Sequence, residues 1–204
     1  MQKPINVRFS FLLILLFHFL TVKAQSDSLW YNSIIEWQQE INREYADSIS
    51  SPLKPEALKN FNGLQFFPPN NEFFVKSTLT LTPDAKPFIM KTSGKKTPTY
   101  VQYGVFSFKL KGQEFFLSAY KRVEILTSDE YADYLFIPFY DLTNGNETYE
   151  GGRYLDCKIQ GDNQYFLDFN KAYNPYCAYN NKYSCPIPPD ENFLNIRIEA
   201  GVMK

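Results

Sequence analysis

Residues 99–122 read TYVQYGVFSFKLKGQEFFLSAYKR, and this stretch decides the fold. Hydrophobic and polar side chains alternate on both sides of Lys111-Gly112, which is the pattern of two strands joined by a tight turn. A turn at this dipeptide sets the facing pairs Phe108 with Phe115, Phe106 with Leu117, and Lys109 with Glu114. Apolar side chains then meet on one face and opposite charges on the other, so the register is consistent with itself. The stretch therefore predicts an antiparallel β-hairpin.

The same alternation recurs before and after this hairpin. Further strands are predicted over residues 73–82, 87–92, 135–139, 153–159, 164–170 and 193–199. Glycine, proline and asparagine separate these segments and no long helix intervenes, which is typical of an antiparallel sandwich or a small barrel. No internal repeat or linker divides the chain. We therefore expect a mainly β fold, a single antiparallel β-sandwich or small barrel-like domain over residues 61–204.

An amphipathic helix is expected to precede the β domain, within a helical segment over residues 25–60. Its apolar side chains recur every three or four residues along one stripe: Trp30, Ile34, Trp37, Ile41 and Tyr45. A polar cap among residues 26–28 is expected to begin the helix, and Ser51-Pro52 is expected to stop it. A second, short helix is predicted over residues 55–60, with Pro55 at its first position.

Met1–Ala24 has the pattern of a secretory signal peptide. A basic start is followed by an apolar run over residues 9–20 and by a small residue, Ala24, at the expected cleavage point before Gln25. The apolar run is about a dozen residues, which is shorter than the roughly 20 needed to span a bilayer. We therefore expect an exported, soluble protein, periplasmic or extracellular, with no transmembrane segment after cleavage.

Composition excludes several classes of function. The formal net charge is −1, and the expected leader carries basic but no acidic residues, so the remaining chain is mildly acidic. Such a charge argues against nucleic acid or an anionic membrane as the main partner. The single histidine, His18, lies within the expected leader. Without it, a Ser-His-Asp triad and histidine-ligated metal sites are ruled out, and we expect no cofactor.

A second hairpin is expected around a three-residue loop at Gly161-Asp162-Asn163. In that register Asp156 falls directly opposite Asp168, although like charges facing each other destabilise a sheet. Such a pair is hydrated, hydrogen-bonded, neutralised by a cation or an arginine, or shares a proton. Proton sharing would give the paired carboxylates of a general acid and base.

Arg153 begins the strand that carries Asp156 and follows a polar loop rich in glycine. Asp141, Thr143 and Thr148 are suited to closing that loop through hydrogen bonds from backbone to side chain. Arg153 is a natural counter-ion for Asp141 or for the aspartate pair, and its planar fork could also hold a ligand carboxylate or phosphate. The structural salt bridge is the favoured interpretation.

The cysteines are interpreted from the expected compartment. Cys177 and Cys185 are separated by seven residues, and export to an oxidising compartment predicts a disulfide between them. Closing so small a loop is expected to contribute about 2–3 kcal/mol. Cys157 falls on an apolar strand face and is expected to be a buried free thiol. A reactive loop thiol or a zinc site is a less favoured alternative.

Four motifs together resemble domain-of-unknown-function family 1684. They are Asp141-x-Thr-x-Gly-x-x-Thr-Tyr149-x-x-Gly-Arg-Tyr-Leu-Asp156, Leu167-Asp-Phe-Asn170, Ala172-Tyr-Asn-Pro-x-Cys-Ala-Tyr179 and Cys185-Pro-x-Pro-Pro189. The motif-dense match covers about residues 134–201, and the first half is similar only as a helix followed by strands. Members usually end in Ala-Gly-Glu-Lys, from which this chain departs after Gly201. The resemblance implies exported bacterial proteins without an established activity.

Two classes of function fit these residues. Polar and aromatic side chains are expected to gather at one rim of the domain: Asp141, Tyr149, Arg153, Asp156, Asp168, Asn170, Asn174 and Tyr179. The favoured class is a non-catalytic binding or structural envelope protein that uses this rim for a small ligand, a glycan or a partner protein. The alternative is a hydrolase with Asp156 and Asp168 as acid and base and Arg153 holding an anionic group. A cation held by the aspartates is a variant of either class.

Overall fold

The computed structural model describes residues 7–126, 129–161 and 164–204. The chain forms two compact units, the first ending at Glu40 and the second running from Ile41 to Lys204. Helix α1 (Val7–Ala46) continues across this boundary. Within the described part of the chain, no helix is long and apolar enough to cross a membrane.

Helix α1 begins earlier than the sequence predicts. The cap expected among residues 26–28 does not begin a helix, because α1 already runs through these residues. Between Val7 and Ala46 there is neither proline nor glycine, so no residue interrupts the helical backbone. The helix ends shortly before the expected stop, and the second helix, α2 (Pro55–Lys59), lies where it was predicted with Pro55 in its first turn.

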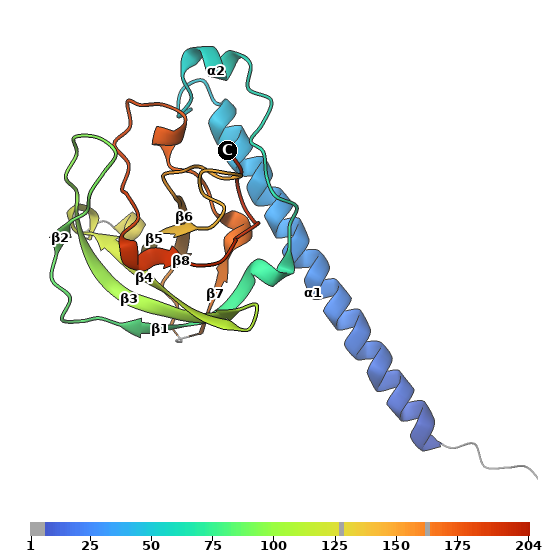
Figure 1. The fold of residues 1–204 in the computed structure, drawn as a ribbon. Coiled ribbons are helices and arrows are strands. Elements are labelled where there is room, and N and C mark those ends of the chain that lie inside the picture. The colour runs from blue at the N-terminus through green and yellow to red at the C-terminus, as the bar shows by residue number, and fades with distance from the viewer. Residues whose placement is uncertain (1–6, 127–128, 162–163) are drawn as a thin grey trace, which may run out of the picture. The chain divides into compact units, whose positions relative to one another are not determined.

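The second unit is built around one curled sheet of eight strands (Figure 1). The strands are β1 (Phe74–Leu81), β2 (Phe88–Ile89), β3 (Thr99–Leu110), β4 (Gln113–Arg122), β5 (Tyr134–Asp141), β6 (Arg153–Lys158), β7 (Gln164–Asp168) and β8 (Phe193–Leu194). Their order is β6-β5-β4-β3-β1-β7, while β2 pairs with β3 and β8 runs parallel to β5. The expected mainly β, barrel-like fold with an N-terminal helix is thus confirmed.

The hairpin of β3 and β4 has the predicted register. Phe108 pairs with Phe115, Phe106 with Leu117, and Lys109 with Glu114. The turn residues Lys111 and Gly112 have φ angles of 50° and 78°, as a tight hairpin turn of the I′ type requires. An irregularity between Gln102 and Gly104 shifts the register farther along. The shift exchanges which residues face each side of the sheet.

The two faces of the sheet bury different clusters. One is the main apolar core, to which β5 contributes Leu135, Ile137 and Phe139. Alternate residues of β3 to β6, together with residues from the irregular segments, build a second, aromatic cluster: Met90, Tyr100, Tyr120, Phe136, Tyr154 and Cys185, with Tyr134, Tyr173, Tyr176, Cys177 and Tyr183 packed against it. Because side chains alternate along a strand, β5 and β6 serve both clusters at once.

The second predicted hairpin is wrong. β6 pairs with β5 and β7 pairs with β1, so the two strands lie at opposite ends of the strand order. Asp156 therefore faces Phe136, and Asp168 faces Phe74. The loop residues 162–163 lie outside the described residues. The alternation of buried Tyr165 and exposed Phe166 fits either partner, because alternation fixes the face of a side chain but not the neighbouring strand.

Candidate ligand-binding pocket

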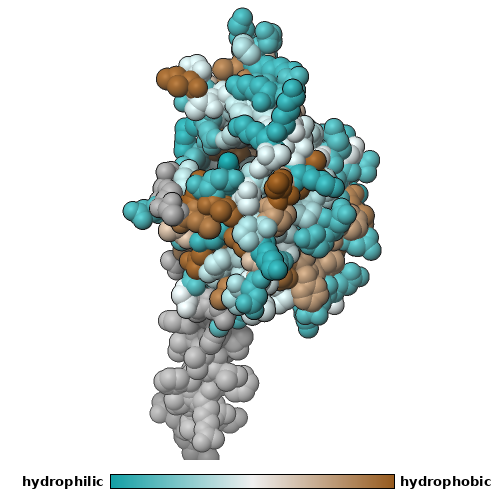
Figure 2. Space-filling view, turned by 90° about the vertical axis from the view of Figure 1, so that its left-hand side faces the viewer, coloured by the Kyte–Doolittle hydropathy of each residue, from teal (hydrophilic) through white to brown (hydrophobic). Residues whose placement is uncertain are grey.

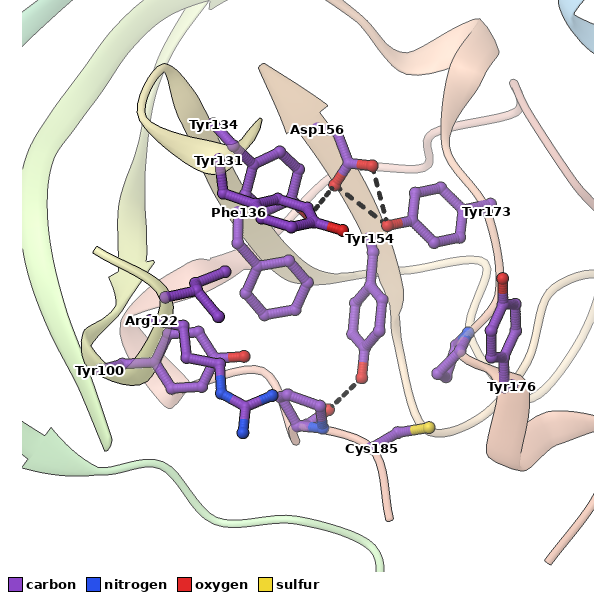
Figure 3. Close-up of a pocket in the computed structure, with 13 residues that line it drawn as sticks. Tyr100, Arg122, Tyr131, Tyr134, Phe136, Tyr154, Asp156, Tyr173, Tyr176 and Cys185 are labelled. Atoms are coloured by element: carbon purple, nitrogen blue, oxygen red, sulfur yellow. Dashed lines mark hydrogen bonds between the residues drawn. The ribbon is translucent and has the colours of Figure 1, made fainter. Parts of the chain in front are cut away.

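A pocket of about 630 Å³ opens on the aromatic cluster of the second unit. Its lining residues are Tyr100, Arg122, Ile125, Tyr131, Tyr134, Phe136, Tyr154, Asp156, Tyr173, Pro175, Tyr176, Cys185 and Pro186. Figure 3 shows the rings turned toward a common space, with Asp156 at one side of it. The volume is within the range of pockets that hold small organic molecules.

Strand register explains the floor of the pocket. Tyr100 of β3 pairs with Arg122 of β4, and Phe136 of β5 pairs with Asp156 of β6. Paired residues lie on the same face of a sheet, as do residues two apart, so Tyr134 joins Phe136 on this face. The floor is therefore made by alternate residues of four neighbouring strands.

The segment after β7 forms the opposite wall. Tyr173 and Tyr154 exchange backbone hydrogen bonds, N to O at 2.9 and 3.0 Å, which fixes the segment to β6. The Tyr154 hydroxyl donates to the carbonyl of Pro186. The rings of Phe136 and Tyr154 meet edge to face at 4.7 Å, and those of Tyr154 and Tyr173 at 5.8 Å. The wall is thus held by backbone bonds and ring contacts together.

Asp156 is held in place by two tyrosines. The hydroxyl of Tyr134 donates to Asp156 Oδ1 at 2.7 Å, and that of Tyr173 contacts both carboxylate oxygens at 3.0 Å (Figure 3). The Asp156 residue is partly open to solvent, yet the rings of Tyr134 and Tyr173 lie against its carboxylate. Desolvation by these rings raises the pKa of Asp156, and the two hydroxyl bonds oppose the rise only in part.

The neighbouring tyrosines are fixed as neutral donors. Desolvation, followed by the nearby Asp156 charge, raises the pKa of Tyr134 and of Tyr173 well above the ordinary value of 10.0. Both hydroxyls therefore keep their protons and point them at the carboxylate. The Asp156 carboxylate is therefore an acceptor that is held by two neutral donors, the hydroxyls of Tyr134 and Tyr173.

Arg122 is already paired at the other side of the pocket. Its Nε donates to Glu124 Oε2 at 3.1 Å, and the two side chains are both largely exposed. A further carboxylate, Glu44, accepts a hydrogen bond from the hydroxyl of Tyr176. Two carboxylates, Glu124 and Glu44, thus lie behind the described lining residues Arg122 and Tyr176.

The predicted pair of Arg153 and Asp141 exists, and it lies inside the domain. Arg153 Nη2 donates to Asp141 Oδ2 at 2.8 Å, with both side chains fully buried. The same guanidinium donates to the carbonyls of Ile198 and Ala200. Asp141 also accepts from the backbone N of Thr143, closing the polar loop as predicted. Arg153 thus fixes the C-terminal segment and does not reach the pocket.

Asp168 and Asn170 are also used within the fold. Asp168 Oδ1 accepts from the backbone N of Asn170 at 3.1 Å and caps a short 3₁₀ turn. The Asn170 side chain accepts from the N of Asn70 and donates to its O, at 2.8 and 2.9 Å. The expected dyad of Asp156 and Asp168 is therefore not assembled, because the strand pairing that would bring the two together is absent.

The remaining predicted rim residues make contacts within the domain, and one of them, Asn174, holds the C-terminal segment. Asn174 Nδ2 donates to the O of Met203 at 2.9 Å and contacts the hydroxyl of Tyr179 at 3.1 Å. The Tyr149 hydroxyl lies 4.0 Å from Cys177 Sγ. None of these three predicted binding residues, Asn174, Tyr179 and Tyr149, is part of the described pocket lining.

Cys177 and Cys185 lie side by side as thiols. The backbone N of Cys177 donates to Cys185 Sγ at 3.2 Å. The hydrogen bond from the Cys185 thiol lowers the pKa of Cys177 to about 6. Cys157 is half-buried against the main core, where desolvation raises its pKa to about 11. Both thiols are free in the structure, so the expected disulfide between Cys177 and Cys185 is not shown.

Sequence reasoning named Asp156 but missed the aromatic pocket around it. The signal was present in two strands, where Tyr134 and Phe136, and then Tyr154 and Asp156, alternate with apolar residues of the main core. In β5 the residues of both sets are apolar or aromatic, which indicates a strand buried on two faces. The residues of the other wall come from an irregular segment, whose position no periodicity predicts.

The surface offers no broad apolar area on the face seen in Figure 2. Hydrophobic side chains reach that surface in separate patches among hydrophilic ones. Among the residues that the structure describes, no group of three histidine, cysteine, aspartate or glutamate side chains is placed to hold a metal ion. The pocket is therefore the feature from which a function is best argued.

Comparisons with known proteins agree with the family resemblance. The model of a family described as "Protein of unknown function (DUF1684)" matches residues 59–203, which extends beyond the motif-dense region into the first strands. An uncharacterized protein of Haloarcula marismortui, whose structure was determined in solution by NMR, is 32% identical and has a TM-score of 0.70. The similarity covers 88% of this chain and 97% of that protein. No curated protein matches the chain.

Proposed function

The chain belongs to the DUF1684 family of proteins of unknown function, and we propose from its pocket that it is a non-catalytic binding protein for a small organic molecule. The observation that carries this proposal is the pocket of about 630 Å³, walled by tyrosines whose positions are fixed by strand register. A preformed aromatic cavity with few polar groups is the usual architecture of a small-molecule site. We further propose that the protein acts after export, in the periplasm or outside the cell, as its N-terminal pattern indicates.

Binding is a better explanation of the pocket than hydrolysis. A hydrolase of the expected kind needs two carboxylates within reach of one substrate. Asp156 is the one carboxylate among the described lining residues, and Asp168 caps a turn elsewhere. Arg153, the expected anion holder, is fully buried in its pair with Asp141. The groups that remain can orient a ligand, which is what a binding protein requires.

A neutral fluorescent dye, N-phenyl-1-naphthylamine, tests whether the pocket is a binding site. Ile125 lines the pocket and Leu126 does not, so Ile125→Trp should fill the cavity while Leu126→Trp leaves it open. We expect dye fluorescence to rise on binding to wild type and to Leu126→Trp. The affinity of Ile125→Trp for the dye should be at least about tenfold lower. Equal binding by both variants would place the dye elsewhere and contradict the proposal.

Native mass spectrometry of protein purified without denaturation tests the non-catalytic role. A molecule carried through purification should be bound at one equivalent, should be lost from Ile125→Trp, and should keep its mass during long incubation. A steady change in the mass of that molecule, faster with wild type than with Ile125→Trp, would contradict a binding role and indicate an enzyme.

A further inference from the structure

We infer that the ligand of this pocket carries a positively charged amine, bound with its ammonium group at Asp156 among the tyrosine rings. The inference rests on the proposed binding function and adds the chemical class of the ligand. It follows from the ring lining, from the direction of the hydrogen bonds at Asp156, and from the charges around the pocket.

The lining is dominated by aromatic side chains. Seven of the described lining residues are aromatic: Tyr100, Tyr131, Tyr134, Phe136, Tyr154, Tyr173 and Tyr176. The faces of such rings carry partial negative charge and attract cations, most strongly where water is displaced. Figure 3 shows several of these rings grouped around the space beside Asp156. An ammonium group placed there would meet ring faces and a carboxylate at the same time.

The hydrogen bonds at Asp156 leave acceptors toward the pocket and no donors. Tyr134 and Tyr173 both use their hydroxyl protons on the carboxylate. Each hydroxyl oxygen therefore has only lone pairs left to offer, and the carboxylate itself is an acceptor. A carboxylate accepts at about four positions, and the two tyrosines supply only two protons, that of Tyr173 being shared between Oδ1 and Oδ2. Lone pairs and a carboxylate charge therefore face the same space, and they attract the positive charge of an ammonium group whether or not it carries N–H donors.

The surrounding charges favour the same ligand class. Arg122, the basic side chain among the described lining residues, is compensated by Glu124. It also belongs to β4, two strands from Asp156 on β6, so the backbones are about 10 Å apart. Glu44 adds a negative charge behind Tyr176. Among the described lining residues, no basic side chain therefore lies beside Asp156 to compensate its carboxylate.

Three probes of similar shape but different charge separate the contribution of charge to the affinity from that of shape. Choline carries a trimethylammonium group, 3,3-dimethyl-1-butanol replaces its nitrogen with carbon, and 3,3-dimethylbutanoate is the corresponding anion. Titration of ¹⁵N-labelled protein by NMR gives an affinity for each. We expect choline to bind at least about tenfold more tightly than the alcohol, and the anion to bind most weakly.

Variants then assign that preference to the pocket. Asp156→Asn keeps an acceptor for the tyrosines and removes the charge, so choline should weaken about tenfold while the alcohol is unchanged. Phe136→Leu keeps an apolar side chain but removes a ring, and should weaken choline more than the alcohol. Glu114→Gln, an exposed carboxylate in the β3–β4 hairpin, is the matched control and should change neither.

The possible results distinguish this inference from the function on which it rests. Equal affinity for choline and the alcohol would overturn the ammonium inference, while dye binding lost in Ile125→Trp would still support a binding pocket. The inference would also be overturned if none of the three probes shifted the NMR resonances of the pocket residues. A choline preference that survives Asp156→Asn would place the cation elsewhere and would count against the inference in the same way.

Discussion

The Arg153 guanidinium and the Asp141 carboxylate lie 2.8 Å apart inside the domain, both fully buried. Carbonyls of the C-terminal segment satisfy the other side of the guanidinium. Removing one partner leaves the other charge buried without compensation, which typically costs about 3–5 kcal/mol. We therefore expect Arg153→Met to reduce the free energy of unfolding by about this amount, measured by urea denaturation.

The surface pair of Arg197 and Glu147 is the control for that experiment. Its side chains are 41% and 35% exposed, so solvent screens their attraction. Arg197→Met should therefore lower the free energy of unfolding much less than Arg153→Met does. Equal losses in the two variants would contradict the structural role assigned to Arg153.

Asp156 predicts a pH dependence of stability. Its pKa is raised above the ordinary 3.8, mainly by desolvation, so the unfolded carboxyl ionises first as the pH increases. Wild type should then lose stability relative to Asp156→Asn as the pH rises from 3.8 through the raised pKa, and the difference should be constant beyond it. Urea denaturation across this pH range measures the difference.

Glu147 is expected to give a pH dependence of stability opposite to that of Asp156. The hydrogen bond from Arg197 lowers the pKa of Glu147, so this carboxylate should add stability as the pH rises through its lowered pKa. Glu147→Gln should lose that gain. If Asp156→Asn and Glu147→Gln change the pH profile in the same direction, the desolvated environment assigned to Asp156 is wrong.

At the scale of elements, strand pairing determines whether two acidic side chains interact. Asp156 on β6 and Asp168 on β7 belong to strands that pair with different neighbours. The effects of Asp156→Asn and Asp168→Asn on the free energy of unfolding should therefore add, with a coupling below about 0.5 kcal/mol in a double-mutant cycle. A larger coupling would indicate the facing register that the sequence first suggested.

Local patterns predicted the first hairpin and the place of each strand because neighbouring residues determine both. The strands expected over residues 87–92 and 193–199 are shorter than predicted, with only two residues each in β2 and β8. The turn at Lys111-Gly112 brings its own two strands together, so pairing and register follow from one stretch. The pairing of β7 with β1 joins segments about 90 residues apart, and the sequence of neither strand predicts which strand it pairs with. The candidate site was predicted only in part for the same reason. Asp156 was recognised from the local sequence, but the aromatic residues around it are brought there by long-range packing.

At the scale of the whole molecule, the N-terminal pattern predicts processing and export. A basic start, an apolar run and Ala24 indicate cleavage before Gln25. When the full chain is expressed with its own leader, the recovered protein should begin at Gln25 and should be found outside the cytoplasm. Intact-mass measurement of fractionated cells checks both statements, and a full-length mass in the cytoplasmic fraction would refute them.

Export in turn predicts the redox state of the three cysteines. An oxidising compartment favours disulfides between neighbouring cysteines. Cys177 and Cys185 are free thiols in the structure, and the backbone N of Cys177 donates to Cys185 Sγ at 3.2 Å, so a disulfide would need the two sulfurs to approach each other. The low pKa of Cys177, about 6, makes it the attacking thiolate when an oxidant or a mixed disulfide is present. Cys157 is packed on the core with a raised pKa and should stay reduced.

Alkylation of the unfolded, unreduced exported protein should therefore add one label, at Cys157, and prior reduction should raise this to three. Three labels without reduction would exclude the disulfide, and Cys177→Ser should then leave stability unchanged instead of lowering it by about 2–3 kcal/mol.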